Sequence, residues 1–392
     1  MVFETKKLEK VTDILQKINN EQRLLFLLSR VSPDDEAIKR AGDIIRKGLN
    51  WAAFVDLCIA NSTANIVYKN LLKLHPVPKE IVERFSRIYF GTLRSNILQI
   101  NELDRLLEEC YKEGIEIIAL KGASVSEIIF RDIGLYPSSD IDFLFKAKDF
   151  DRLKAVFERN GYRLYDEHLS GYKNYYLKEQ YHCVFSNGTF TFEPHWNLFF
   201  RYFNAPPDFW WSEALLVESN GRKYWYLSPE KNILYQSFRI FSKGFNSLKF
   251  LAIISETVNY YNDIMDWKKL FFYAKRYRFQ NVLYAVLMMC RDFLGADITP
   301  EISSLRNLRA DMLYKKASDL ILNPEPARNP IIKVWLTLIA INLQSSFKIL
   351  LKRLFPPVAE VRIRYHIYDS SSKIYIYYLL NPLLLILRKH QK

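Results

Sequence analysis

Asp140 and Asp142 are separated by one apolar residue and are followed by Phe143-Leu144-Phe145, a pattern typical of a short β-strand. Residues two positions apart on a strand point to the same face, so the two carboxylates should lie side by side. Neighbouring carboxylates repel each other unless a cation lies between them. Carboxylate oxygens combined with substrate phosphates suit Mg²⁺, and Mn²⁺ takes similar ligands. The spacing therefore predicts a Mg²⁺ or Mn²⁺ site that handles a phosphate-bearing substrate.

Glu193 is a third candidate metal ligand. Residues 190–193, Phe-Thr-Phe-Glu, alternate apolar and polar side chains as a half-buried strand does, and Glu193 falls on the polar face. If this strand lies next to residues 140–145, the three carboxylates converge. Such a set can hold two metal ions about 3.5–4 Å apart for in-line displacement at phosphorus. Asp140, Asp142 and Glu193 are therefore the candidate catalytic and metal-binding residues.

The segment Lys121-Gly122-Ala123-Ser124 lies between an expected strand, 115–120, and an expected short helix, 124–130. Glycine lets a phosphate approach the backbone, and a helix N-terminus favours negative charge. Lys121 could neutralise a phosphate as a point charge or only cap the strand end. Ser124 could contact a phosphate while it caps the helix. These residues and Ser139, in the loop before the aspartates, are the candidate phosphate-binding residues.

Taken in order, these motifs resemble a bacterial family of uncharacterised nucleotidyltransferases in the DNA polymerase β-like superfamily. The resemblance rests on Lys121-Gly122, Asp140-Ile141-Asp142 and Glu193-Pro194-His195-Trp196. It continues through Leu227-Ser228-Pro229-Glu230, Asp266-Trp267 and Leu354-Phe355-Pro356-Pro357, and it spans roughly residues 40–380.

The resemblance implies an enzyme that transfers a nucleoside monophosphate from an NTP, such as ATP, to an acceptor hydroxyl and releases pyrophosphate. One metal ion would position the triphosphate, and a second would lower the pKa of the acceptor hydroxyl. Lys121, Gly122, Ser124 and Ser139 would then be nucleotide-binding. The acceptor stays open among small molecules, peptides and nucleic acids.

The sequence departs from the family pattern in a few places. An arginine expected shortly before the first aspartate is replaced by Tyr136. Histidines expected on the helix after the core, and an aspartate on the next helix, are replaced by Tyr235, Arg239, Lys243 and Ile253. Arg239 and Lys243 add positive charge near the expected acceptor, and His195 would orient a ligand or contact the acceptor. The departures keep a second interpretation open, a nucleotide-binding or scaffold protein that retains the fold without catalysis.

The hydrophobic periodicity predicts an α+β protein, in which a small mixed-sheet core is flanked by helical regions. The expected division is an N-terminal helical region at 1–112, the nucleotidyltransferase core at 113–227 and a C-terminal helical domain at 228–392. A long helix is expected at 79–111. Within the core, we expect strands at 115–120, 140–145, 162–165, 172–177, 181–186 and 189–193, a helix at 148–160, and irregular structure at 195–226.

The composition is that of a packed protein with excess positive charge. The 392 residues are 49% hydrophobic and carry a formal net charge of +13. This charge indicates either a basic surface with no dedicated partner or attraction for a nucleotide, a nucleic acid or an anionic membrane. The four cysteines form no CxxC pair, and the first residues lack the apolar core of a signal peptide, so a cytoplasmic location is expected.

No segment reaches the roughly 18–20 apolar residues of a transmembrane helix. The C-terminal run 374–387 is broken by Asn381-Pro382 and followed by Arg388-Lys389-His390-Gln391-Lys392. This run is either a helix docked on the core or an interfacial anchor with a basic end, and the second interpretation would bring peripheral membrane contact through the C-terminus.

Overall fold

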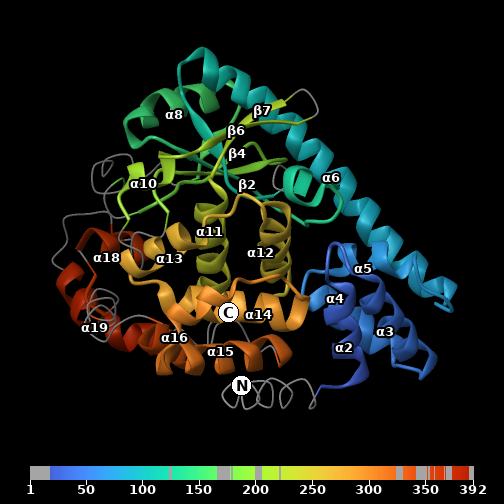
Figure 1. Ribbon diagram of the computed structural model, residues 1–392. Helices are drawn as coiled ribbons and strands as arrows, with labels where there is room; N and C mark the ends of the chain where they lie inside the picture. The colour runs from blue at the N-terminus through green and yellow to red at the C-terminus, as the bar shows by residue number, and fades with distance from the viewer. Residues whose placement is uncertain are drawn as a thin grey trace.

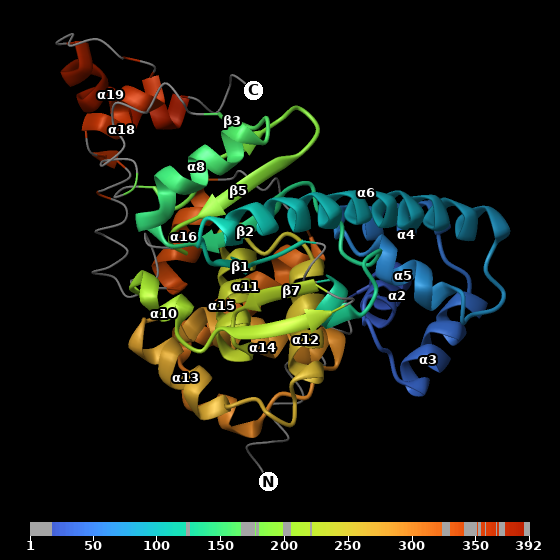
Figure 2. The ribbon, with the colours of Figure 1, turned by 90° about the horizontal axis from the view of Figure 1, so that it is seen from above.

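The computed structural model has one mixed β-sheet with helices against both of its faces (Figure 1). It describes residues 18–122, 126–165, 177, 180–198, 205–219, 222–323, 330–340, 351, 354–356, 358–365, 367 and 373–387. Helices α6 and α8 cover one face, and α11 and α12 pack against the other (Figures 1 and 2). The chain is therefore a mixed α and β protein, consistent with the expected α+β class.

The helices before the sheet are α2 (Asn20–Leu28), α3 (Asp35–Arg46), α4 (Trp51–Ala60), α5 (Ala64–Leu71) and α6 (Lys79–Lys112). Short helices within the sheet region are η1 (Ser126–Phe130), η2 (Ala147–Asp149), α8 (Phe150–Arg159) and α10 (Pro207–Trp211). The helices that follow are α11 (Pro229–Ser242), α12 (Lys249–Tyr260), α13 (Trp267–Arg276), α14 (Gln280–Leu294), η4 (Pro300–Leu305), α15 (Leu308–Leu322), α16 (Pro330–Ala340), α18 (Val358–Tyr365) and α19 (Lys373–Leu387). None of these described helices combines the length and the apolar character needed to cross a membrane.

The sheet contains seven strands in the order β3-β4-β5-β2-β1-β7-β6. The strands are β1 (Ile117–Ala119), β2 (Ile141–Phe145), β3 (Arg163–Leu164), β4 (Phe185–Ser186), β5 (Thr191–His195), β6 (Leu215–Ser219) and β7 (Arg222–Tyr226). Strands β2 and β5 are parallel neighbours, as are β1 and β7, whereas the other pairs are antiparallel. The predicted adjacency of the two carboxylate-bearing strands is confirmed.

Aromatic side chains fix α8 against the sheet. Phe157 of α8 is buried together with Phe143, Phe185 and Phe192, and the ring centroids lie 4.7 to 6.3 Å apart. Burying each phenylalanine contributes about 1.5–3 kcal/mol. Because side chains alternate along a strand, Asp142 points to the opposite face of the sheet, toward α11.

Helix α6 holds the loop that leads into β2. This helix is 34 residues long and runs without a break through Gly91. The Asn96 amide donates to the Tyr136 carbonyl at 2.8 Å, and the Gln99 amide donates to the Ser138 carbonyl at 3.0 Å. These bonds satisfy loop carbonyls that would otherwise be buried without partners, and they fix the backbone just before Asp140.

Several expected boundaries shift, and one expectation is wrong. Strand β2 begins at Ile141, so Asp140 lies one residue before it. The stretch expected to be irregular, 195–226, contains α10 and the antiparallel hairpin of β6 and β7. The sequence does carry a hairpin signal there, since Asn220-Gly221 separates the two strands. The expected strand at 172–177 lies outside the described residues, apart from Leu177.

Candidate active site

Asp142 and Glu193 face each other across the parallel strands β2 and β5. The sheet register pairs them directly, and paired residues on neighbouring strands point to the same side. His195 lies two residues after Glu193 and therefore on the same face. One oxygen of Asp142, one oxygen of Glu193 and one ring nitrogen of His195 all lie within 4.8 Å of one another. This spacing is close enough for a single cation to contact all three groups.

Lys121 lies between the two aspartates. Its Nζ is 2.9 Å from Asp140 Oδ2 and 2.7 Å from Asp142 Oδ2. The Lys121 side chain is only 13% exposed and that of Asp142 only 2%, whereas Asp140 is 22% exposed at the end of its loop. The repulsion expected between the two carboxylates is thus relieved by an ammonium group from the end of β1.

Asp142 and Glu193 have very different pKa values because their surroundings differ. Burial opposes ionisation of Asp142, but contacts with His195 and Lys121 outweigh it and hold the pKa of Asp142 well below its usual range. Burial and the negative charges of Asp142 and Asp140 raise the pKa of Glu193 to about 7. Burial disfavours the Lys121 ammonium, yet the charge of Asp142 keeps the pKa of Lys121 above its ordinary value. A further cation beside Glu193 would favour its ionised form.

A stack of rings fixes His195. Its Nε2 meets Asp142 Oδ1 at 3.0 Å, so the ring is held by the same carboxylate that contacts Lys121. The His182 ring stacks on it at 5.1 Å, and the Tyr181 ring stacks at 5.8 Å. A backbone bridge joins His182 to His195, and burial, reinforced by His195, lowers the pKa of His182 to about 4. His182 is therefore neutral near pH 7 and adds no positive charge.

Two further cations lie behind Lys121, on the helices after the sheet. Arg239 of α11 donates to the Tyr136 hydroxyl at 3.1 Å and to Gln236 at 2.9 Å. Lys249, at the start of α12, donates to the Pro137 carbonyl at 3.2 Å, and its Nζ lies 4.9 Å from the Tyr136 ring centre. Within the described residues, no carboxylate oxygen lies within 4.0 Å of either cationic head group.

The pKa shifts of the surrounding groups indicate that Arg239 and Lys249 lie close enough to the aspartates to interact with them electrostatically. Burial would raise the pKa of Tyr136, but Arg239 and Lys249 outweigh it and lower that pKa below its ordinary value. Burial and the charges of Arg239 and Lys121 lower the pKa of Lys249, with Tyr136 opposing them. Burial disfavours the Arg239 guanidinium, but Tyr136, Tyr235 and, after them, Asp142 outweigh it and raise the pKa of Arg239 above its usual value.

Family membership follows from comparison with known proteins. The family described as uncharacterised nucleotidyltransferase matches residues 47–295. This chain belongs to that nucleotidyltransferase family. No curated protein and no solved structure matches the chain. The resemblance to a nucleotidyltransferase family, drawn from the sequence motifs, is confirmed.

The nucleotidyltransferase match covers both the carboxylates and the cations of α11 and α12. Asp142 and Glu193 lie together, as their spacing predicted, while Asp140 contacts Lys121 and Ser139 and is outside the close group with His195. Lys243 is exposed just after α11, with no described contact to the carboxylates. Lys249, which no sequence pattern singled out, occupies the neighbourhood expected for Lys243.

The turn after β1 brings its backbone close to the loop before β2. Gly122 has a φ of +85°, a conformation that favours glycine, and a Cβ placed there would lie 3.0 Å from Ser138 Oγ. Ser138 donates to the Asp140 carbonyl at 2.8 Å, and Ser139 donates to Asp140 Oδ1 at 3.1 Å. Ser124 lies outside the described residues.

The other positions at which this nucleotidyltransferase departs from the expected pattern are buried. Tyr136, Tyr235 and Ile253 are each at most 2% exposed. Tyr136 accepts the Arg239 hydrogen bond, and burial raises the pKa of Tyr235 well above its ordinary value. Tyr235 on α11 and Ile253 on α12 therefore belong to the buried core, and Tyr136 precedes β2.

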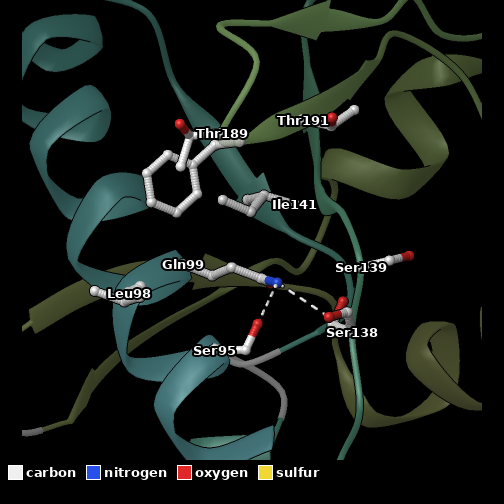
Figure 3. Close-up of a pocket in the computed structure, with 9 residues that line it drawn as sticks. Ser95, Leu98, Gln99, Ser138, Ser139, Ile141, Thr189 and Thr191 are labelled. Carbon is white, nitrogen blue, oxygen red and sulfur yellow. Dashed lines mark hydrogen bonds between the residues drawn. The ribbon is translucent and has the colours of Figure 1, made fainter. Parts of the chain in front are cut away.

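A pocket of about 230 Å³ opens between α6 and the beginnings of β2 and β5, on the α6 side of the sheet (Figure 3). It is lined by Ser95, Leu98, Gln99, Ser138, Ser139, Ile141, Thr189, Phe190 and Thr191. The lining carries hydroxyls, one carboxamide and one aromatic ring, with no charged side chain. Ser139 belongs to the lining and also contacts the Asp140 carboxylate. The pocket suits an uncharged polar group about the size of one sugar ring or one base.

Proposed function

We propose that this protein transfers a nucleoside monophosphate from an NTP to an acceptor hydroxyl, in a metal-dependent reaction that releases pyrophosphate. The observation that carries the proposal is the pairing of Asp142 with Glu193 across parallel strands, with Asp140 and Lys121 at the edge of the pair. Membership of a nucleotidyltransferase family supports the reaction class.

The donor set fits Mg²⁺ or Mn²⁺. Asp140, Asp142 and Glu193 offer hard carboxylate oxygens. Burial, together with the negative charges of Asp142 and Asp140, raises the pKa of Glu193, so a bound cation would favour its ionised form. His195 would hold Asp142 in position or contribute a nitrogen ligand, which Mn²⁺ accepts more readily than Mg²⁺ does. Bound metal would neutralise the phosphates and lower the pKa of the acceptor hydroxyl.

Lys121, Arg239 and Lys249 supply the positive charge that a bound triphosphate needs. Lys121 already has two aspartate partners, whereas Arg239 and Lys249 have no carboxylate partner among the described residues. Buried cations without counter-ions are costly, and a triphosphate would supply the missing negative charge. In the proposed complex these side chains would hold the triphosphate by charge-assisted hydrogen bonds, and Gly122, Ser124 and Ser139 would complete the nucleotide contacts.

This assignment places the nucleotide between two parts of the chain. The proposed core, 113–227, would supply the carboxylates, and the proposed C-terminal helical domain, 228–392, would supply Arg239 and Lys249. The proposed N-terminal region, 1–112, would support the core through α6, which fixes the loop before Asp140.

On the acceptor side, the pocket that includes Ser139 and Thr191 would take an uncharged part of the acceptor, because its lining offers hydroxyls without charge. The exposed Lys243 would reach only a part of the acceptor outside this pocket. We also propose a cytoplasmic location, which is supported by the four buried cysteines: none of them forms a disulfide, as expected in a reducing compartment.

One observation favours a second function, binding without catalysis. Lys121 bridges both aspartates, so these two carboxylates are stable together without a metal ion. A protein that had lost the reaction could keep this arrangement as a structural ion pair. Nucleotide binding that is independent of metal would support this alternative.

Metal-dependent nucleotide binding separates the two functions. Binding of each NTP would be measured by calorimetry with EDTA, Mg²⁺ or Mn²⁺, for the wild type and for the double variant Asp140→Asn/Asp142→Asn. The proposal expects binding only with metal and its loss in the double variant, whereas Asp56→Asn, at an exposed site on α4, should behave as the wild type. Unchanged affinity in the double variant would falsify the proposed site. Pyrophosphate release in an acceptor screen would then establish catalysis.

A further inference from the structure

The outward face of α19 is apolar. Tyr375, Ile376, Leu379 and Leu380 are exposed by 65%, 58%, 71% and 41%. Their spacing of one, three and four residues places them on one side of the helix. A helix that packs on a protein surface normally turns charged or polar residues outward. On α19 this side instead carries large aliphatic and aromatic groups.

The inward face of the same helix carries a polar residue, Asn381, as well as the buried Ile374. Asn381 is fully buried, accepts a hydrogen bond from the Tyr365 hydroxyl at 2.9 Å and donates to the Leu354 carbonyl at 2.7 Å. Tyr365 belongs to α18, so the two helices are joined by a satisfied polar contact. The exposed apolar side chains, and not the buried ones, are therefore the unusual feature of α19.

More exposed apolar side chains lie along the same end of the chain. Leu351, Phe355 and Val358, in and just before α18, are 40–42% exposed. The α18–α19 pair lies at the margin of the molecule, away from the sheet (Figure 2). Monomeric proteins in water rarely expose apolar side chains together in this way, so this surface is expected to meet an apolar phase or a partner.

The charge around the exposed face of α19 indicates which partner can cover it. Helix α19 contains no acidic residue and begins with Lys373, and the chain continues directly as Arg388-Lys389-His390-Gln391-Lys392. Two copies meeting through this face would bring these basic groups together, which is unfavourable. An anionic lipid surface offers an apolar interior for the aliphatic groups and negative headgroups for the basic ones, at about 1 kcal/mol per basic residue near the surface.

We propose that the α18–α19 hairpin docks this protein onto an anionic membrane surface. Helix α19 lies in the interface, with Ile376 and Leu379 among the upper acyl chains and Tyr375 at headgroup level, where aromatic hydroxyls are favoured. Its fifteen residues extend only about 22 Å, against a hydrocarbon thickness of about 30 Å, which suits a helix parallel to the surface.

Vesicle binding of the full chain tests this proposal without any assay of nucleotide transfer. Co-sedimentation would compare phosphatidylcholine vesicles with vesicles of phosphatidylcholine and phosphatidylglycerol at low and physiological salt. The expected result is binding to the anionic vesicles, at least tenfold weaker in Ile376→Glu/Leu379→Glu and unchanged in Ile264→Glu. Ile264 is 66% exposed between α12 and α13, and so it is a matched control.

A second variant tests the charge separately. Arg388→Glu/Lys389→Glu should lose binding to the anionic vesicles, in a salt-dependent manner, while its thermal unfolding stays as in the wild type. Equal binding to both vesicle types, or equal loss in the Ile264→Glu control, overturns the proposal. So does a mass by light scattering that doubles in the wild type and returns to one chain in Ile376→Glu/Leu379→Glu, because the face would then join two copies.

Discussion

Replacing Glu193 by glutamine should make the metal-free protein more stable above neutral pH. Glu193 has a pKa of about 7 in the folded chain, against an ordinary value of 4.5. Between these two values the folded state holds a proton that the unfolded state has released, so the free energy of unfolding falls as pH rises. Below pH 4.5 the contribution is absent from both chains, and above pH 7 the wild type carries the full penalty.

The size of this effect follows from the shift. A difference of about 2.5 pKa units corresponds to about 3.4 kcal/mol if solvent screening is ignored. Glu193 is only partly buried, and screening reduces the expected gain at pH 8 to about 1–2 kcal/mol, or several degrees in melting temperature at most.

Thermal unfolding of wild type and Glu193→Gln in EDTA, from pH 4.5 to pH 8.5, would measure this difference. The two curves should converge at acid pH and separate between pH 5 and pH 7. Glu108→Gln, at an exposed position on α6, should follow the wild type throughout. Adding Mn²⁺ at pH 8 should reverse the order, because the wild type gains a ligand that the variant lacks. A variant that is less stable than the wild type at pH 8 in EDTA would show that Glu193 is not under repulsion from the aspartates.

Three further predictions concern the cations and the turn. Arg239→Met and Lys249→Met should each weaken NTP binding about 10–100-fold, as expected for loss of a hydrogen bond to a charged group, while Lys243→Met stays near wild type in the same calorimetric titration. Lys121→Met should lower the metal-free stability by about 3–5 kcal/mol, because two aspartates lose their shared partner, and Mn²⁺ should restore part of it in a melting assay. Gly122→Ala should cost about 1–2 kcal/mol in chemical denaturation, because alanine is strained at a φ of +85°.

The part of the site that lies on alternating strands could be predicted from the sequence. Alternation in residues 190–193 and around Asp142 fixed which side chains share a face, and the register pairs Asp142 with Glu193 as expected. The same alternation already put His195 on the ligand face, two residues after Glu193. His195 was expected to orient a ligand or contact the acceptor, but spacing alone could not indicate that the carboxylate it meets is Asp142.

The remainder depends on contacts between distant segments. Lys249 reaches the site because α12 begins beside the Pro137 carbonyl, 112 residues earlier in the chain, and no local pattern encodes that distance. Likewise, β7 joins the sheet by pairing in parallel with β1, which local alternation cannot indicate. The hairpin of β6 and β7, in contrast, could have been predicted locally, because Asn220-Gly221 is typical of a two-residue hairpin turn. The many aromatic residues around it favoured an irregular interpretation instead.

Lys121 connects the stability of the metal-free protein to its proposed chemistry. Its ammonium touches both aspartates at 2.7 to 2.9 Å, so it holds in place two carboxylates that would otherwise repel each other. A metal ion that contacts the same oxygens would remove that need and leave the lysine charge without its partners. The nearest compensation would then be a phosphate, and Arg239, already within electrostatic range of Lys121, would face the same group. Metal and triphosphate should therefore bind with positive coupling, and Lys121→Met should reduce that coupling more than it reduces the affinity for metal alone.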